Sequence, residues 1–479
     1  MRINLVLSVL ARVLQLELAI LFIPLAVAFF YGESTSPYLL TMGLLALSSL
    51  IFMLRPKSNK ALRPKDGFAA VALSWVAISF FGAFPFYFSG LQLSFIDAFF
   101  EAVSGFTTTG ATIFTTMAQV PRGLIFWRGL TQFIGGMGIL LFMMTMTASS
   151  ASGVNMLKGE STGPTASKLL PRIRETARLL YRIYFTLTGL LALLLWFCGF
   201  PLFDAIFTAM CTAGTGGFGY RDLGLAAYNS PLAEGIIALF MFLFGINFTL
   251  YFYLMRRKVR DFWADEEFRL YLGLTLAAIL LITPNIFTLY GSWSTALRHS
   301  AFQVTGVIST TGYATANYAN WPAFSKAILL LLTLCGGCAG STGGGLKVIR
   351  ILLVFKNIKS EVGKLLHPRI VRTNRLQGRN VPDDAMKATL MYFSLYALFF
   401  ICFSVILALE NPDFEGVLAA VLAIISNVGP GLGSMGPLGN FSLFSNIAKI
   451  TLSFGMFATR LEFYPVLLLF APSLWHWDD

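Results

Sequence analysis

The sequence predicts an all-α membrane protein of ten transmembrane helices, in which four parallel helix–pore-loop–helix repeats surround a pseudo-fourfold pore after an N-terminal helical hairpin. Three observations predict this fold. Apolar runs of about 20 residues recur along the chain, as membrane-spanning helices require. Hydrophobic residues make up 56% of the 479 residues and charged residues 12%, about half the charge of a soluble protein. Four stretches also repeat one plan: a short apolar segment, a hydroxyl-rich run and a glycine.

Basic residues gather between the apolar runs and predict the topology. Of 35 Lys and Arg residues, 26 fall in four loops: five in 55–66, six in 158–182, five in 256–269 and ten in 347–387. Positive charge marks the cytoplasmic side of a membrane protein, so we expect these loops and both termini in the cytoplasm. The net charge of +12 therefore indicates topology and not nucleic-acid binding. Loop 347–387 could equally dock an acidic regulator or anionic membrane lipid.

Residues 1–66 predict a two-helix hairpin, with helices near 4–30 and 37–54. The first apolar run is longer than the core of a cleaved signal peptide and has no small-residue cleavage site, so we expect a retained helix.

Four pore repeats follow, at 67–180, 181–269, 270–387 and 388–479. Each is expected to hold a helix running outward, a half-helix, a glycine turn and a helix running back. The paired outer helices are expected near 68–90 and 123–147, 181–200 and 232–255, 270–290 and 325–355, and 388–409 and 443–471.

The four repeated stretches predict half-helices that enter the membrane without crossing it. They are DAFFEAVSGFTTTG at 97–110, DAIFTAMCTAGTGG at 204–217, TALRHSAFQVTGVISTTG at 295–312 and DFEGVLAAVLAIISNVG at 413–429. About twelve helical residues reach only about 18 Å, little more than half the hydrocarbon core. Aspartates open three of them, where a negative or capping group suits a helix N-terminus. Non-helical backbone inside a membrane lines water or is buried in protein, so four such segments predict a shared central cavity.

We expect the selectivity filter of a cation pore where the half-helices end. The candidate residues are Thr108, Thr109, Gly110, Thr215, Gly216, Gly217, Thr310, Thr311, Gly312, Asn427, Val428 and Gly429. Glycine reaches backbone angles that other residues avoid, and carbonyls turned to one axis replace water around K⁺. These loops hold no carboxylate, so a divalent-ion site is not expected. The register stays open in loop two (Gly216 or Gly217) and in loop four (Gly429 or Gly431), and close helix packing is the alternative role for any one glycine.

Two further features are unusual inside apolar runs: a glycine-rich segment and an embedded arginine. Residues 336–345 hold six glycines and cannot form a stable continuous helix; a close-packing kink is the alternative. A phosphate-binding loop is rejected because Leu346 and Lys347 follow the last glycine and no strand precedes the segment. Arg460 lies deep in the last apolar run, where an arginine faces a partner or water. A structural ion pair with Glu462 is the alternative there, and for Arg128 and Asn247 we expect hydrogen bonds between helices.

The sequence predicts no enzyme. Cys335 and Cys338 have metal-like spacing, but no second pair or histidine cluster accompanies them. An intramembrane enzyme would need clustered His, Cys or carboxylate groups, and the three histidines are scattered. A secondary transporter for a small solute would need inverted repeats and charges at mid-membrane. The expected ligand is K⁺ at the filter carbonyls, with no organic cofactor.

At these residues the chain resembles the Trk/Ktr/HKT superfamily of cation transporters, most closely the bacterial TrkH-type potassium-uptake transmembrane subunit. The matching stretches are SGFTTTGAT (104–112), ISTTGYAT (308–315), SNVGPGLG (426–433), GGCAGSTGGGLKVIR (336–350) and RLEFYP (460–465). They cover essentially the whole chain, and loop two (CTAGTGGFG) matches less well. The resemblance implies potassium uptake in the bacterial inner membrane, a homodimer and a cytosolic nucleotide-binding regulator of the TrkA type.

The resemblance also implies where ion passage is controlled. It makes the glycine-rich segment an intramembrane gating loop below the filter, and it places Arg460 in the permeation path as an electrostatic barrier. The implied gating residues are Gly336, Gly337, Gly340, Ser341, Thr342, Gly343, Gly344, Gly345, Lys347 and Arg460. A sodium/potassium-coupled symporter and a less selective monovalent cation transporter remain as alternatives.

Overall fold

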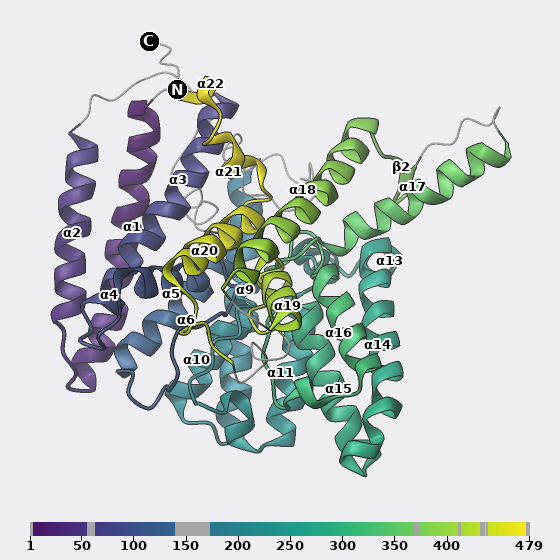
Figure 1. Ribbon diagram of the computed structural model, residues 1–479, viewed down its shortest axis with the longest axis horizontal. Coiled ribbons are helices and arrows are strands. Elements are labelled where there is room, and N and C mark those ends of the chain that lie inside the picture. Colours follow the sequence, from purple (N-terminus) through teal and green to yellow (C-terminus); the bar gives the residue numbers. More distant parts are fainter. Residues whose placement is uncertain are drawn as a thin grey trace.

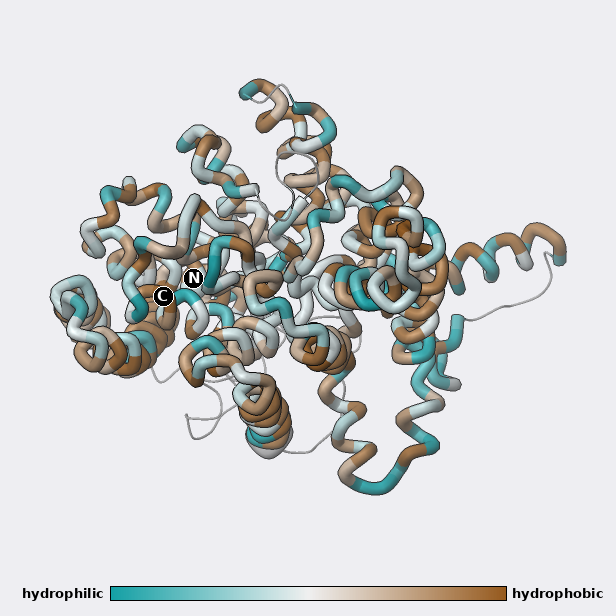
Figure 2. The backbone as a smooth tube through the Cα atoms, turned by 90° about the horizontal axis from the view of Figure 1, so that it is seen from below, coloured by the Kyte–Doolittle hydropathy of each residue, from teal (hydrophilic) through white to brown (hydrophobic). Residues whose placement is uncertain are grey.

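The computed structural model describes residues 3–54, 63–138, 173–367, 374–410, 413–431, 436 and 439–475. These residues form a bundle of helices with one small β-hairpin (Figure 1). Six of the helices are long and apolar enough to cross a membrane, and hydrophobic residues predominate along the chain between the turns (Figure 2).

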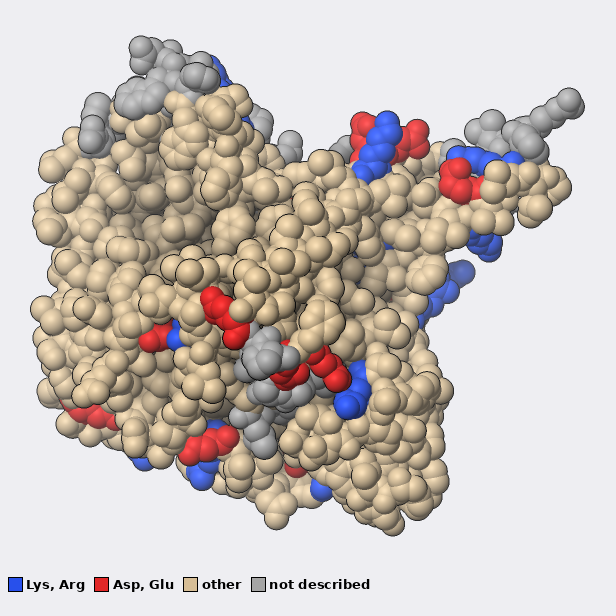
Figure 3. All heavy atoms as spheres, in the orientation of Figure 1, with Lys and Arg blue, Asp and Glu red and all other residues tan. Residues whose placement is uncertain are grey.

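The outer surface is apolar over large areas. Phe29, Phe30 and Leu280 are each more than 70% exposed. Figure 3 shows wide uncharged areas over the N-terminal hairpin and over the lower right of the molecule, while Lys, Arg, Asp and Glu gather in a few places. A soluble monomer rarely exposes apolar patches of this extent, so the chain is a multi-pass membrane protein.

The N-terminal hairpin packs against the first repeat. Helices α1 (Ile3–Phe30) and α2 (Ser36–Met53) pack along each other, and α1 also contacts α3 (Pro64–Gly82). The turn between α1 and α2 also contacts the first repeat: the Glu33 carboxylate accepts hydrogen bonds from the N–H groups of Arg122 and Gly123 at 2.7 and 2.9 Å. It thereby caps α6 (Arg122–Met137), because an anion is favourable at a helix N-terminus.

The remaining elements follow in chain order and are grouped by the repeats that the sequence predicts, although the first helices of the second, third and fourth repeats begin a few residues before the bounds predicted for them. The first repeat continues with α4 (Phe84–Tyr87) and α5 (Phe95–Phe106) before α6, and the second holds α9 (Ile173–Phe197), α10 (Leu202–Ala213), η1 (Gly224–Tyr228), α11 (Pro231–Phe244), α12 (Phe248–Met255) and α13 (Val259–Ala264). The third holds α14 (Glu266–Tyr290), α15 (Trp293–Ile308), η2 (Tyr318–Asn320), α16 (Ala323–Cys335), α17 (Val348–Leu366), β1 (Arg375–Leu376) and β2 (Arg379–Asn380). The fourth holds α18 (Asp383–Ala408), α19 (Phe414–Ile425), α20 (Asn446–Arg460), α21 (Tyr464–Leu468) and α22 (Pro472–Trp475).

The outer helix expected near 325–355 is interrupted between α16 and α17, as the glycines of 336–345 predict, and two further expected outer helices are not continuous. The span expected at 232–255 is bent by 95° between α11 and α12, because the backbone turns away at Gly245–Asn247 and the Asn247 side chain caps α12 by accepting from Thr249 N at 2.9 Å. The span expected at 443–471 ends at Arg460, where Glu462 and Phe463 take positive φ angles of 58° and 63°. Left-handed residues of this kind stop a helix.

Parts of the predicted topology lie outside the described residues. These parts are residues 55–62 of the first basic loop, 139–172 of the first repeat, 368–373 of loop 347–387 and both chain ends. Helix α17 projects away from the bundle, with β2 beside its middle, and the start of α1 lies at the same end of the molecule as α22 (Figure 1).

Candidate ion-conduction site

The four half-helices end at equivalent places in the sequence. Helices α5, α10, α15 and α19 finish at Phe106, Ala213, Ile308 and Ile425. Each of these residues lies four positions before a candidate filter glycine, which is Gly110, Gly217, Gly312 or Gly429. The correspondence places the negative ends of four helix dipoles next to the four glycine turns, where a cation is favoured.

The backbone leaves each half-helix by the same turn. The second residue after the helix is left-handed in all four loops: Thr108, Thr215, Thr310 and Asn427 have φ angles of 55°, 54°, 62° and 54°. The next N–H reaches back five residues to a helix carbonyl, as Thr109 N does to Ser104 O at 2.9 Å and Val428 N to Ala423 O at 2.8 Å. This is the Schellman pattern of a helix C-terminus. A non-glycine residue in this region costs about 1–2 kcal/mol, so the fold retains strain at four matching positions.

The four turns contact one another in a closed ring. A methyl group on Gly110 would lie 2.0 Å from the carbonyl oxygen of Gly216, and one on Gly217 would lie 1.8 Å from that of Thr311. In the same way, a methyl group on Gly312 would lie 1.9 Å from the Val428 carbonyl oxygen. One on Gly429 would lie 2.5 Å from that of Thr109, which closes the ring. All four glycines also have positive φ, between 70° and 92°. No residue with a side chain fits at these positions without moving the backbone of the neighbouring loop.

The ring aligns the two loops whose register the sequence left open. Gly217 and Gly429 take the places that Gly110 and Gly312 take in their own loops. All four line one cavity of about 280 Å³. Gly431, the other candidate in loop four, instead packs against the backbone of α19 at Ala419 and Ala420, and its carbonyl accepts from Tyr318 Oη at 3.2 Å.

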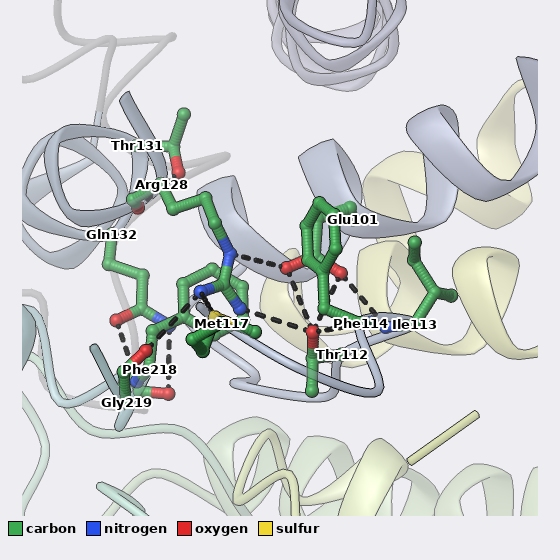
Figure 4. Close-up of polar contacts among 11 residues, drawn as sticks. Glu101, Thr112, Ile113, Phe114, Met117, Arg128, Thr131, Gln132, Phe218 and Gly219 are labelled. Atoms are coloured by element: carbon green, nitrogen blue, oxygen red, sulfur yellow. Dashed lines mark hydrogen bonds and ion pairs between the residues drawn. The ribbon is translucent and has the colours of Figure 1, made fainter. Parts of the chain in front are cut away.

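Side chains from outside the loops hold the first two turns in place (Figure 4). The Gln132 amide donates from Nε2 to the Gly216 carbonyl at 2.8 Å and accepts at Oε1 from Phe218 N at 3.2 Å. One helical turn earlier on α6, Arg128 forms an ion pair with Glu101 of α5 at 2.7 Å. The hydrogen bonding expected between helices for Arg128 is therefore confirmed, and its main partner is a carboxylate.

The glycine-rich segment 336–347 separates α16 from α17 and packs beneath loop three. Gly344 N donates to Thr310 Oγ1 at 2.7 Å, so the segment contacts a residue of the candidate filter directly. It also occupies the bend between α11 and α12: Cys338 N donates to Gly245 O at 2.9 Å and Phe248 N to Gly340 O at 3.0 Å. The bend that interrupts the expected helix 232–255 therefore makes room for this segment.

Arg460 connects the glycine-rich segment to another repeat. Its guanidinium donates to Thr342 O at 3.0 Å and to Gly135 O and Gly136 O at 2.6 and 3.3 Å. The nearby Arg350 forms an ion pair with Glu462 at 2.6 Å. Lys347 lies buried at the start of α17, and its ammonium donates to Gly343 O within the same segment. Three basic side chains, those of Arg460, Lys347 and Arg350, therefore donate to carbonyls of the glycine-rich segment 336–347.

Glu267, at the start of α14, holds both ends of the glycine-rich segment. Its Oε1 atom accepts from Ala339 N at 2.6 Å and from Ile349 N at 3.1 Å, and the residue is 3% exposed. The adjacent Glu266 contacts the β1–β2 hairpin instead, where it accepts from Gln377 N at 2.9 Å.

At the outer rim of the cavity, Arg221 and Tyr228 both contact the Asp204 carboxylate of α10. Arg221 forms an ion pair with it at 3.2 Å, and Tyr228 donates to it at 2.6 Å. Burial of the phenol, together with this hydrogen bond, raises the pKa of Tyr228 well above its usual value. The sequence predicted that Asp204 begins this half-helix; in the structure Pro201 is the N-cap, and Asp204 lies in the first turn of α10, where it anchors the loop that holds Arg221 and Tyr228.

Three residues of the site, Glu101, Gln132 and Glu267, were not predicted from the sequence. Glu101 is the one acidic residue in the interior of the 97–110 stretch, and this was the available signal. Gln132 and Glu267 contact residues 84 and 72 positions away, and no local pattern announces such pairs.

Comparisons with known proteins agree with this geometry. A family model described as "Cation transport protein", TrkH, matches residues 40–478. The Trk system potassium uptake protein TrkH of Salmonella typhimurium is 38% identical over 437 residues, 90% of each chain. The Trk system potassium uptake protein TrkG of Escherichia coli is 34% identical over 94% of each chain. The crystal structure of the potassium transporter TrkH from Vibrio parahaemolyticus superimposes with a TM-score of 0.89 at 31% identity, and the match covers 99% of this chain and 100% of that one.

Proposed function

The chain belongs to the TrkH family of cation transport proteins, and from this premise we propose that it takes up K⁺ through a selectivity filter of four glycine-containing loops. It is a Trk-system potassium uptake transporter, and its relatives are named as transporters and not as enzymes. The architecture proposed around this filter is ten helices with four parallel helix–pore-loop–helix repeats.

One observation carries the proposal: the ring of Gly110, Gly217, Gly312 and Gly429 around one cavity. A methyl group added to any of these glycines would lie within 2.5 Å of a carbonyl oxygen of a neighbouring loop. The main chains of the four loops therefore converge. The filter residues beside them supply hydroxyl and carbonyl oxygens and no carboxylate. Weak coordination by oxygen alone suits a monovalent cation whose hydration shell is easily replaced.

The gate in this proposal is the glycine-rich segment 336–347 together with Arg460. The segment contacts Thr310 at the base of the ring, and Arg460 contacts the segment at Thr342. A fixed positive charge on the inner side of a cation path raises the barrier to passage, so movement of Arg460 or of the segment opens the path.

The setting of the transporter is the bacterial inner membrane with both termini in the cytoplasm. This orientation is supported by the basic loops, because Lys and Arg remain on the cytoplasmic side. A homodimer and a cytosolic nucleotide-binding regulator of the TrkA type are expected from the family resemblance. A sodium/potassium-coupled symporter or a less selective cation transporter is the second candidate.

Growth of cells that lack their own potassium uptake tests the function. Expression of this chain, with its regulator where one is required, should restore growth at low external K⁺. Gly217→Ala should abolish this rescue. The matched control is Gly43→Ala, which should still rescue growth because no atom lies within 4 Å of a Cβ added at Gly43. Failure of the wild-type chain to rescue growth while present in the membrane, under every condition that activates its relatives, would count against the proposal.

A further inference from the structure

The ion pair of Glu101 and Arg128 is buried between two of the four filter loops. The two side chains are 0% and 1% exposed, and Arg128 Nε lies 2.7 Å from Glu101 Oε1. Removing one partner of a buried pair leaves an uncompensated charge, so the pair stays intact only where the surroundings satisfy both groups.

Arg128 links the segments that follow filter loops one and two. Its other nitrogens donate to Thr112 Oγ1 at 3.1 Å, two residues after Gly110, and to Gly219 O at 3.3 Å, two residues after Gly217. The guanidinium also stacks over the Phe218 ring at 4.0 Å from its centroid. One planar cation therefore spans the corresponding positions of two neighbouring loops (Figure 4).

Glu101 fixes that cation from the half-helix. Besides Arg128, its carboxylate accepts from Ile113 N at 3.0 Å and from Thr112 Oγ1 at 3.1 Å. The carboxylate therefore ties the end of loop one back onto α5, the helix from which the loop begins. Charge-assisted bonds of this kind are about twice as strong as neutral ones and fix geometry as well.

The ion pair of Glu101 and Arg128, with its hydrogen bonds to Thr112, Ile113 and Gly219, is called the brace below. Its acidic residue is present in one repeat of four. The residue nine positions before the filter glycine is Glu101 in the first repeat and Thr208, Gln303 and Ala420 in the others. Gln303 is fully buried, and neither polar atom of its amide has a partner among the described residues. The half-helix fold accepts polar, neutral or apolar residues at this position, so the charge in the first repeat is not a requirement of the fold.

We infer that Glu101 and Arg128 are positioning residues that set the spacing of filter loops one and two and thereby the discrimination between K⁺ and Na⁺. The inference rests on the proposed filter and deepens it. A braced ring holds its carbonyls at the distance that K⁺ needs, whereas a ring free to contract also coordinates the smaller Na⁺. The pair acts through the backbone of the loops and does not itself bind the ion.

Uptake of K⁺ and Na⁺ per molecule of transporter in the membrane tests this inference. Glu101→Gln removes the charge at almost constant shape, and Arg128→Lys keeps the charge but cannot span both loops. Each variant should lower the preference for K⁺ over Na⁺ by about tenfold, the effect of losing one charge-assisted contact. A purely structural role would lower the uptake of both ions together and leave their ratio at the wild-type value.

Two variants keep the result decisive. Thr112→Val is isosteric and removes only the hydroxyl between Arg128 and Glu101, so it reaches the membrane even if the charge variants do not, and it should lower the ratio by about threefold. Glu234→Gln is the matched control, because it neutralises the ion pair of α11 with Arg298 of α15, and its ratio should stay at the wild-type value.

Gly110→Ser separates the inference from the proposed filter. If this variant loses K⁺ preference while Glu101→Gln, Arg128→Lys and Thr112→Val keep it, the filter stands and the brace is wrong. If Gly110→Ser also keeps the wild-type ratio, the proposed filter itself fails.

Discussion

Gly110 shows how much of the proposed selectivity depends on a missing side chain. Its φ is 83°, and the Gly216 carbonyl lies 2.0 Å from where a methyl group would be. The same carbonyl accepts from Gln132, so it is held on one side and crowded on the other. Loop two therefore has little freedom to move away from a substituted loop one.

Gly110→Ser is expected to reduce discrimination against Na⁺ by about tenfold or more, because the two loops can only separate by deforming the ring of carbonyls. The measurement is the ratio of K⁺ to Na⁺ uptake in cells that lack other uptake systems. A ratio equal to that of the wild type would show that Gly110 serves helix packing alone.

Arg460→Ala is expected to raise the maximal K⁺ flux by about fivefold, because removal of a positive charge lowers an electrostatic barrier of ~1 kcal/mol next to water. Arg460→Lys, which keeps the charge, is the control and should conduct at close to the wild-type rate. Flux is compared at equal amounts of protein in the membrane, and equal flux in Arg460→Ala and the wild type would exclude Arg460 from the gate.

At the level of helices, the sequence predicted positions well and continuity poorly. The half-helices were recognisable because Asp97, Asp204 and Asp413 open short apolar segments that end in hydroxyl groups and glycine. The bend at Gly245–Asn247 was not recognisable. Its cause is the glycine-rich segment, about 90 residues further along the chain, which donates a hydrogen bond to Gly245 O and accepts one from Phe248 N. The end of α20 at Arg460 depends on the positive φ angles of Glu462 and Phe463. Neither residue type favours positive φ, so the sequence did not predict this turn.

Glu267→Ala tests whether the contacts of α14 keep the glycine-rich segment in place. The substitution removes the acceptor of Ala339 N and Ile349 N, so the segment loses its attachment at both ends. If the closed state thereby loses ~1.4 kcal/mol of stability relative to the open state, K⁺ flux should rise about tenfold.

Glu266→Ala is the matched control for this change, because its carboxylate contacts Lys356 and Gln377 rather than the segment. Its flux should remain near the wild-type value. Equal flux in Glu267→Ala and the wild type would show that the segment is held by its other contacts.

Across the whole molecule, the filter is expected to require each repeat to the same degree. Gly217→Ala, Gly312→Ala and Gly429→Ala each place a methyl group within 2.5 Å of a neighbouring loop's carbonyl. Each should therefore abolish selective K⁺ uptake, as measured by growth at low K⁺ and by the uptake ratio.

Gly216→Ala is the informative comparison, since its methyl group would meet the Gln132 side chain and not a backbone oxygen. A side chain can rotate away, so this variant should keep more activity than Gly217→Ala. The reverse order would place the filter one residue earlier in loop two.

The site as a whole was predictable where it is made of backbone, and much less so where it is made of side chains. The spacing of the glycines and the neutral polar residues beside them predicted which main chains would meet. The supports behind the ring, Gln132 and the pair of Glu101 with Arg128, depend on helices that pack only after folding. The register of loop two was open for the same reason, because Gly216 and Gly217 differ in what surrounds them and not in local sequence.

The closed order of contacts, from loop one to two, three, four and back to one, has a consequence for how such a chain can diverge. Each filter glycine faces a carbonyl of a neighbouring loop, so a backbone shift in one loop changes the space that is left for the glycine facing it. An insertion or deletion in one turn is therefore expected to displace the whole ring, whereas a substitution in a flanking helix that leaves its turn in place is not.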